Sequence, residues 1–290
     1  MMRLALEAAA AVDHHVLLLR DEVDLATIEA LIRSRFGGAW PQDEFTIAAG
    51  PETSFSGPYD VDEGVRGALG LPAWAERAVV AHVPTVRGGP LPEGLAGVDP
   101  IFDAYPRALP EGVELEALRF LVAAARRLAG AVLCAGAGLV VPRPNQDCDL
   151  IWFSPIWLDP DALRAQLAPV LGPVRSSLQD ADALGVEETV MASYALYGLD
   201  VPLDVHVEAA DLVPAAVAAF DWAADGAVAY HVRYAGDLET DLAFGPLSDV
   251  EAAEIAQAAL AAARACRAIG DLAPGVVTDD DGFLLELATE

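Results

Sequence analysis

Hydrophobic residues in the first half of the chain follow two spacings, one typical of strands and one typical of helices. Short apolar or β-branched runs occupy residues 16–20, 44–49 and 78–86, which predicts strands. Residues 24–36 and 115–129 instead place apolar side chains three and four positions apart, as one face of a helix requires. A glycine-containing hairpin follows the second helix, so this half is predicted to run strand, helix, strand, strand, helix, strand.

The second half of the chain repeats this order of strand and helix patterns. A strand ends just before Asp159 and Pro160, which are the capping residue and first residue of a predicted helix. The remaining pattern predicts a long strand over residues 193–207, a strand over 227–234 and a long Ala-rich helix over 249–269.

Two pairs of segments are similar between the halves. Residues 74–83 and 222–232 both begin with Trp and lead into an apolar run, with an offset of 149 from Ala78 to Ala227. Residues 131–141 and 275–285 both predict a hairpin, with an offset of 144. We therefore expect an α+β protein of two tandem ferredoxin-like (βαββαβ) units related by internal duplication, residues 1–145 and 146–290.

Charge narrows the classes of partner. The chain carries a net charge of −28, and all 17 of its cationic residues are Arg. The absence of Lys excludes Schiff-base chemistry and a phosphate-binding loop of the Walker type. The acidity disfavours nucleic acids and anionic membranes. It leaves three interpretations: solubility alone, a salt-rich host, or a basic protein partner.

The N-terminus and the cysteines favour a cytoplasmic protein. Residues 1–19 carry Glu7 and Asp13 within their apolar stretch, which is unlike a signal peptide. The longest apolar run, residues 128–141, is too short to cross a bilayer. The three cysteines lie far apart and form no Cys-x-x-Cys pair, so neither a disulfide framework nor a zinc ribbon is predicted. No cofactor motif is present, and we expect no cofactor.

His82 and His231 occupy matching positions in the two halves. One hypothesis makes them a pair of acid–base groups, binding residues or metal ligands. The alternative, which we favour, is a structural histidine kept in both copies of a strand, because nothing else nearby in the sequence marks a catalytic site.

Asp204, His206 and Glu208 alternate along one predicted strand, so their side chains share one face. Two carboxylates and an imidazole suit a divalent metal ion. The competing interpretation is a half-exposed strand whose Val205 and Val207 face the core. Trp157 is a further candidate, either as an anchor of a protein interface or as a core residue.

The run over residues 71–83, the helix over 115–129 and the hairpin over 131–141 resemble a bacterial domain family of unknown function. In that family a short segment that contains Trp leads into a strand, which is followed by a helix and a Gly-containing hairpin. The second half looks like a diverged copy. The resemblance implies no catalytic residue. It implies an acidic binding protein, because such families sometimes neighbour toxin–immunity genes.

The sequence thus favours a non-enzymatic, cytoplasmic protein-binding module, immunity- or regulator-like, whose acidic surface engages a protein partner such as a basic one. Two alternatives stay open. One is a metal-dependent hydrolase using Asp204, His206 and Glu208. The other is a small-molecule sensor with its ligand between the repeats.

Overall fold

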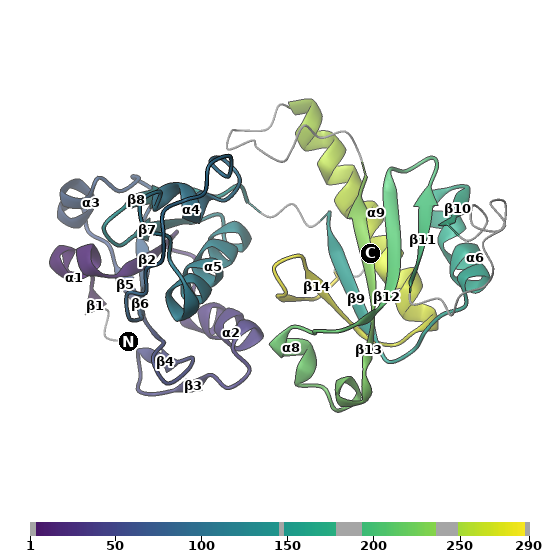
Figure 1. Cartoon of the computed structure of the whole chain (residues 1–290), viewed down its shortest axis with the longest axis horizontal. Coiled ribbons are helices and arrows are strands. Elements are labelled where there is room, and N and C mark those ends of the chain that lie inside the picture. The colour runs from purple at the N-terminus through teal and green to yellow at the C-terminus, as the bar shows by residue number, and fades with distance from the viewer. Residues whose placement is uncertain (1–3, 145–147, 178–192, 236–248, 288–290) are drawn as a thin grey trace. The chain divides into compact units, whose positions relative to one another are not determined.

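The computed structural model describes residues 4–144, 148–177, 193–235 and 249–287. The chain forms two compact units, the first built mainly from residues 1–145 and the second mainly from residues 146–290 (Figure 1). Each unit combines helices with a sheet whose ladders are antiparallel, apart from one short parallel pair. The expected α+β class is therefore confirmed.

The first unit is built on a sheet with the strand order β3-β4-β5-β6-β2-β7-β8, and β1 pairs with β5 outside this path. Its helices lie on both faces of the sheet. Its elements are β1 (Leu4–Ala5), α1 (Ala8–Asp13), β2 (His15–Leu19), α2 (Leu25–Arg35), β3 (Trp40–Pro41), β4 (Thr46–Ala48), β5 (Ser54–Asp60), α3 (Glu63–Leu69), β6 (Arg77–His82), α4 (Pro100–Ala104), α5 (Gly112–Arg127), β7 (Ala131–Cys134) and β8 (Gly138–Val140).

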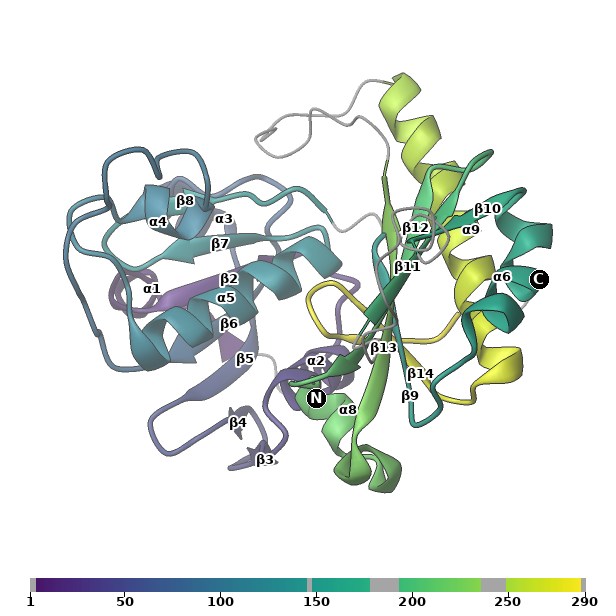
Figure 2. The ribbon, with the colours of Figure 1, turned by 45° about the vertical axis from the view of Figure 1, so that its right-hand side comes forward.

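The second unit is built on a sheet with the order β10-β11-β12-β13-β9-β14-β15. Its two long helices pack against each other on one face of this sheet, as Figures 1 and 2 show. Its described elements are β9 (Leu150–Ser154), α6 (Pro160–Leu171), β10 (Val174–Ser176), β11 (Ser193–Gly198), β12 (Leu203–Ala210), α8 (Ala215–Ala218), η1 (Asp221–Asp225), β13 (Ala227–Tyr234), α9 (Asp249–Leu272), β14 (Val276–Asp279) and β15 (Leu284–Leu285).

The two strand orders are the same when β2 to β8 are read in parallel with β9 to β15. In both units a central strand, β2 or β9, lies between the strand that precedes the second long helix and the strand that follows it. The matched segments of the sequence therefore occupy the same places in the two sheets: β6 corresponds to β13, and the β7–β8 hairpin corresponds to β14–β15.

Four of the helices begin at an aspartate that caps the backbone. Asp24 and Asp62 each accept a hydrogen bond from the backbone N–H three residues later, Asp99 accepts one from two residues later, and Asp159 accepts one from each of these positions. Each cap satisfies N–H groups that the first helical turn leaves without a partner, which stabilises a helix by about 1 kcal/mol. The predicted starts of the helices at Asp24 and Asp159 are confirmed.

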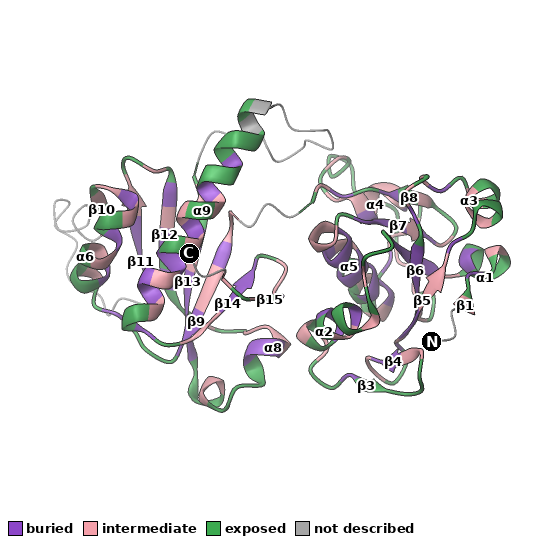
Figure 3. Cartoon of the chain, turned by 180° about the vertical axis from the view of Figure 1, so that it is seen from behind, coloured by how far each residue is buried: buried purple, intermediate pink, exposed green. Residues whose placement is uncertain are grey.

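In each unit, one face of the sheet packs against the long helices. In the first unit, Phe55 of β5 packs against Phe120 of α5, with ring centroids 4.8 Å apart. In the second unit, Leu163 and Leu167 of α6 and Ile269 of α9 are fully buried against the strands. Figure 3 shows these strands and the inner faces of the helices as buried, while the outer faces of the helices are exposed.

Three predicted elements differ from the structure. Residues 51–59, rich in Gly, Pro and Ser, were expected to form a loop, but Ser54–Asp60 is a strand because Phe55 is buried and both neighbouring strands pair with it. The single strand expected over residues 193–207 is a hairpin of β11 and β12. The helix expected over residues 212–220 is the short α8.

Candidate functional site

One face of the second sheet, which α8 and η1 cover in part, carries the polar residues that the sequence singled out. Val205 and Val207 of β12 are fully buried against the helices, so the intervening side chains point to the opposite face. Of these, His206 and Glu208 are exposed and Asp204 is half-buried. The predicted alternation along this strand is confirmed.

His231 of β13 joins these residues across the sheet. It lies opposite His206 in the register, and its Nε2 is 3.0 Å from Oε1 of Glu208, one diagonal position away. Burial lowers the pKa of His231, and the nearby charge of Arg233 lowers it further, against the opposing effect of Glu208. The neutral imidazole then donates its Nε2 hydrogen to Glu208. Its buried Nδ1 has no hydrogen-bond partner among the described residues.

Asp204 lies further along the same face, opposite Arg233. Burial raises the pKa of its carboxyl group, although His206 and Arg175 act in the opposite direction. Within the described residues, no group of three or more His, Cys, Asp and Glu side chains is arranged to hold a metal ion. The strand brings Asp204, His206 and Glu208 to one face, but alternate residues of a strand are spaced about 6.6 Å apart, which spreads them along it.

The first unit contains a histidine at the corresponding position. His82 of β6 lies opposite Ser54, and its Nε2 is 2.6 Å from Oγ of Ser56, again one diagonal position away. Tyr59 donates a hydrogen bond of 2.9 Å to the same Oγ. Thus His82 and His231 occupy equivalent places, but one contacts a hydroxyl group and the other a carboxylate.

The Ser56–His82 pair has one requirement of nucleophilic catalysis, a hydroxyl within hydrogen-bond reach of an imidazole. Burial and the charge of His14 lower the pKa of His82, so it is neutral at pH 7. However, Ser56 is only 4% exposed, and no carboxylate among the described residues bonds the His82 ring to orient it. The geometry is that of a buried hydrogen-bond network rather than a nucleophile presented to a substrate.

The first unit also contains a buried ionic network that the sequence analysis missed. The carboxylate of Glu114, on α5, is completely buried. Its Oε1 is 3.1 Å from Nε2 of His15 and 2.6 Å from Nη2 of Arg87, and its Oε2 accepts the backbone N–H of Val86 at 2.7 Å. The available signal was an acidic residue in line with the apolar stripe of a helix, which predicts a buried and paired carboxylate.

Hydrogen bonds fix the tautomer of His15 in this network. The backbone N–H of Ala135 donates to Nδ1 of His15 at 3.1 Å, so the ring proton is on Nε2 and points to Glu114. Burial lowers the pKa of His15 despite the nearby Glu114 carboxylate, and Arg87 lowers it further. The imidazole is therefore a neutral donor at pH 7.

A pocket of about 510 Å³ opens beside this network. The guanidinium of Arg87 lies over the ring of Tyr105, 3.7 Å from its centroid. The Tyr105 hydroxyl donates to the carbonyl oxygen of Ala135 at 2.8 Å. The pocket is lined by Arg87, Ala104, Tyr105, Pro106, Arg107, Ala108, Ala135 and Gly136.

Four exposed apolar side chains lie on the segments that extend from one end of the second sheet, where β9 and β12 finish and β13 begins. The residues Ile156, Trp157, Leu212 and Phe220 are 40%, 39%, 91% and 37% exposed; we call this set the apolar end. Segments 155–163 and 211–226, which carry it, contain five Asp and no Arg.

The loop that carries Trp157 is held by two buried tyrosines. The hydroxyl group of Tyr230 donates to the carbonyl oxygen of Ile156 at 2.6 Å and accepts the N–H of Leu158 at 2.9 Å. Tyr194 donates to the carbonyl oxygen of Leu158 at 2.9 Å, and its ring meets Trp157 edge-on with centroids 5.8 Å apart. Trp157 is thus partly exposed on a loop that these hydrogen bonds hold, and each of its two candidate roles, core residue and interface anchor, stays a prediction.

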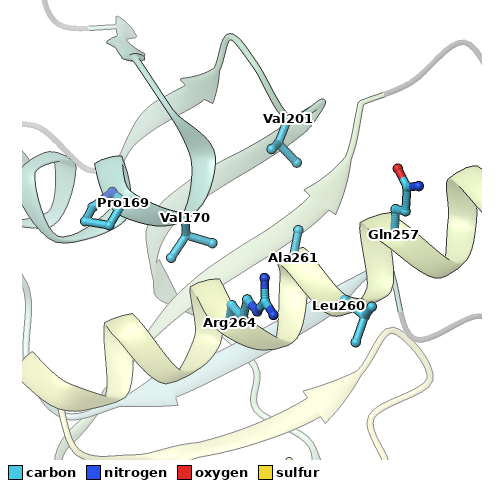
Figure 4. Close-up of a pocket in the computed structure, with 7 residues that line it drawn as sticks. All are labelled: Pro169, Val170, Val201, Gln257, Leu260, Ala261 and Arg264. Atoms are coloured by element: carbon cyan, nitrogen blue, oxygen red, sulfur yellow. The ribbon is translucent and has the colours of Figure 1, made fainter. Parts of the chain in front are cut away.

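Two further hollows lie in the second unit. One, of about 900 Å³, includes Trp152, Phe220 and Leu285 in its lining and therefore adjoins the apolar end. The other, of about 290 Å³, lies between α6 and α9. Figure 4 shows Val170 and Leu260 on its two sides, and its walls are mostly aliphatic. It offers few polar groups to orient a ligand.

None of the helices in the described ranges has both the length and the apolar composition needed to cross a membrane. No disulfide joins the described cysteines, Cys134, Cys148 and Cys266. Comparison with protein-family models, curated proteins and solved structures found no match to this chain.

Proposed function

We propose that this chain is a non-enzymatic, cytoplasmic binding protein that engages a basic protein partner through its second unit. The observation that carries the proposal is the distribution of charge. Residues 146–290 contain 26 acidic residues and five Arg, whereas residues 1–145 contain 19 acidic residues and twelve Arg. Three quarters of the net charge of −28 therefore belongs to the second half, at −21. A basic partner would be steered to that half.

The apolar end gives this acidic unit a place for direct contact. Interfaces typically combine a few apolar anchors with a polar rim. Here Trp157 and Leu212 would be the anchors, and the exposed Asp211, Asp221 and Asp225 would form the rim. Because Tyr230 and Tyr194 already fix the loop of Trp157, little conformational freedom would be lost on binding.

To test the proposal, the full chain is isolated gently from its host together with its partner, and native mass spectrometry identifies that partner. The binding of the purified partner to variants of the full chain is then measured. Leu212→Ala should weaken the complex about tenfold, because a central apolar anchor contributes more than 1 kcal/mol. Leu199→Ala is the matched control: its side chain is 62% exposed and lies in the β11–β12 turn, at the opposite end of the same sheet.

Raising NaCl from about 50 to 500 mM should weaken the complex strongly, since surface charges are screened over a few ångströms at high salt. A complex that resists both salt and Leu212→Ala would refute the proposal, as would the absence of a stoichiometric partner. The metal-dependent hydrolase remains a separate prediction, tested by measuring bound metal in the wild type and in His206→Ala.

We also propose that the two units descend from one duplicated ferredoxin-like unit, which includes the segments that resemble a bacterial domain family. The common strand order and the equivalent positions of His82 and His231 support this proposal. A solved structure of a single-unit homologue with the strand order β3-β4-β5-β6-β2-β7-β8 would test it; a different order would contradict it.

A further inference from the structure

The pocket beside Arg87 in the first unit has the size and composition of a small-molecule site. Its volume of about 510 Å³ falls within the range of about 300–1,000 Å³ that is usual for such sites. It lies entirely within the first unit, on segments 104–108 and 135–136 together with Arg87. It is therefore distinct from the apolar end on which the proposed function depends.

Arg87 is held in place from behind the pocket. One of its terminal nitrogens is 2.6 Å from Glu114, and the face of its guanidinium lies 3.7 Å from the centre of the Tyr105 ring. Glu114 is itself fixed by His15 and by the N–H of Val86. A guanidinium fixed in this way binds an anionic group with little further loss of conformational freedom.

The charges around the pocket favour one negative charge on the ligand. Arg87 and Arg107 line it, and Glu114 pairs with the first of them. His15 is neutral because burial lowers its pKa. Burial also raises the pKa of Tyr105 to about 12 and that of Cys134 to about 11, so both are neutral at pH 7. The charges of these side chains in and beside the pocket therefore add up to +1, although the whole chain has a net charge of −28.

The rest of the lining is apolar. Ala104, Pro106, Ala108 and Ala135 contribute aliphatic surface, and Tyr105 contributes an aromatic ring. Inorganic phosphate would leave this surface uncovered, whereas an apolar group attached to a carboxylate would cover it. We propose that the pocket binds a small organic monoanion, a carboxylate carried on an apolar body, with the carboxylate between Arg87 and Arg107.

The test compares three probes on the full chain by NMR titration and calorimetry: benzoate, uncharged benzamide of the same shape, and inorganic phosphate. Benzoate should bind at least tenfold more tightly than benzamide, because charge-assisted hydrogen bonds to Arg are about twice as strong as neutral ones. The largest shifts of amide signals should come from Tyr105, Ala135 and Gly136.

Arg107→Ala should weaken benzoate binding about tenfold or more, as expected for the loss of a hydrogen bond to a charged group. Because Arg107 is exposed, its replacement should leave the fold intact, which a variant at the buried pair would not guarantee. Arg119→Ala is the control, since Arg119 is also exposed but lies on α5 and does not line the pocket.

Four results would overturn the proposal. They are no saturable benzoate binding up to about 10 mM, equal affinity for benzoate and benzamide, tighter binding of phosphate than of benzoate, and equal losses in Arg107→Ala and Arg119→Ala. None of these depends on a protein partner, so failure here is distinguishable from failure of the proposed function.

Discussion

Replacing Glu114 with glutamine removes a negative charge from the interior of the first unit with almost no change in side-chain size. The carboxylate is fully buried and accepts hydrogen bonds from three groups: His15, Arg87 and the N–H of Val86. The amide of glutamine has one acceptor oxygen and one NH₂ group that can only donate. In either orientation, its NH₂ therefore faces at least one donor.

The cost can be worked out from these contacts. If the amide oxygen takes the position that faces His15 and Arg87, the NH₂ group faces the N–H of Val86 and one charge-assisted bond is lost. Such a bond contributes about 1.5–3 kcal/mol. Arg87 also loses its buried counter-charge, and breaking a buried pair costs about 3–5 kcal/mol in other proteins. These two losses overlap because both concern the same carboxylate, and water offsets part of them because the Arg87 side chain is 21% exposed. We therefore expect the free energy of unfolding of the first unit to fall by about 3 kcal/mol, the lower end of the cost of breaking a buried pair.

Hydrogen exchange in increasing urea, followed by mass spectrometry, measures this loss for each unit separately. Peptides from residues 77–134 should exchange at lower urea in Glu114→Gln than in the wild type, and peptides from residues 150–177 should not change. Glu116→Gln is the control, because Glu116 is on the same helix but exposed, and surface changes usually alter stability by less than about 0.5 kcal/mol. Equal, small effects of the two substitutions would refute the assigned role of the network.

Three further predictions concern the second unit. Tyr230→Phe should lower the free energy of unfolding by about 2 kcal/mol in urea titrations, because the carbonyl oxygen of Ile156 and the N–H of Leu158 both lose their hydrogen bond to the hydroxyl group. Tyr197→Phe is the control, because the ring of Tyr197 is also partly buried. An equal loss of stability in the two variants would contradict this reason. Thr278→Val should raise the free energy of unfolding by about 1 kcal/mol, because the completely buried Thr278 hydroxyl has no hydrogen-bond partner among the described residues. A loss of stability would show that the hydroxyl is satisfied. Folding lowers the pKa of His231 from 6.5, so the unfolded chain binds more protons, and the stability that the neutral histidine contributes is lost as the pH falls below about 6.5. The free energy of unfolding of His231→Gln should therefore fall less than that of the wild type between about pH 7 and 5.5. Parallel plots of unfolding free energy against pH for the two proteins would contradict the assignment.

The elements that could be predicted from the sequence are those with strong local signals. The helices that begin after Asp24 and Asp159 combine a capping residue with an apolar stripe, and both were predicted. Where the local signal opposed the tertiary structure, the prediction was wrong. β5 has the composition of a loop, and its strand conformation depends on pairing with β4 and β6. The turn between β11 and β12 contains Gly198, Asp200 and Pro202, so the sequence did carry a signal for it and the prediction of one continuous strand overlooked that signal.

The candidate sites also differ in whether a local sequence pattern predicts them. The shared face of Asp204, His206 and Glu208 follows from the period of a strand, so the sequence predicts it. The Glu114 network does not follow from any local pattern, because His15 is 99 residues from Glu114 and Val86 is 28 residues away. Only the buried position of an acidic residue on the helix was available in the sequence, and it does not identify the partners.

The two equivalent histidines bear on whether the chain is an enzyme. His82 and His231 have the same register and the same diagonal contact, yet Ser56 stands where the second unit has Glu208. Catalysis depends on the chemistry of the partner, because a hydroxyl is a nucleophile and a carboxylate orients or ionises an imidazole. A structural role needs only a side chain that accepts or shares one hydrogen bond at that position, and both residues provide it. The feature common to the units is therefore the position of the histidine, and the chemistry of its hydrogen-bond partner differs between them.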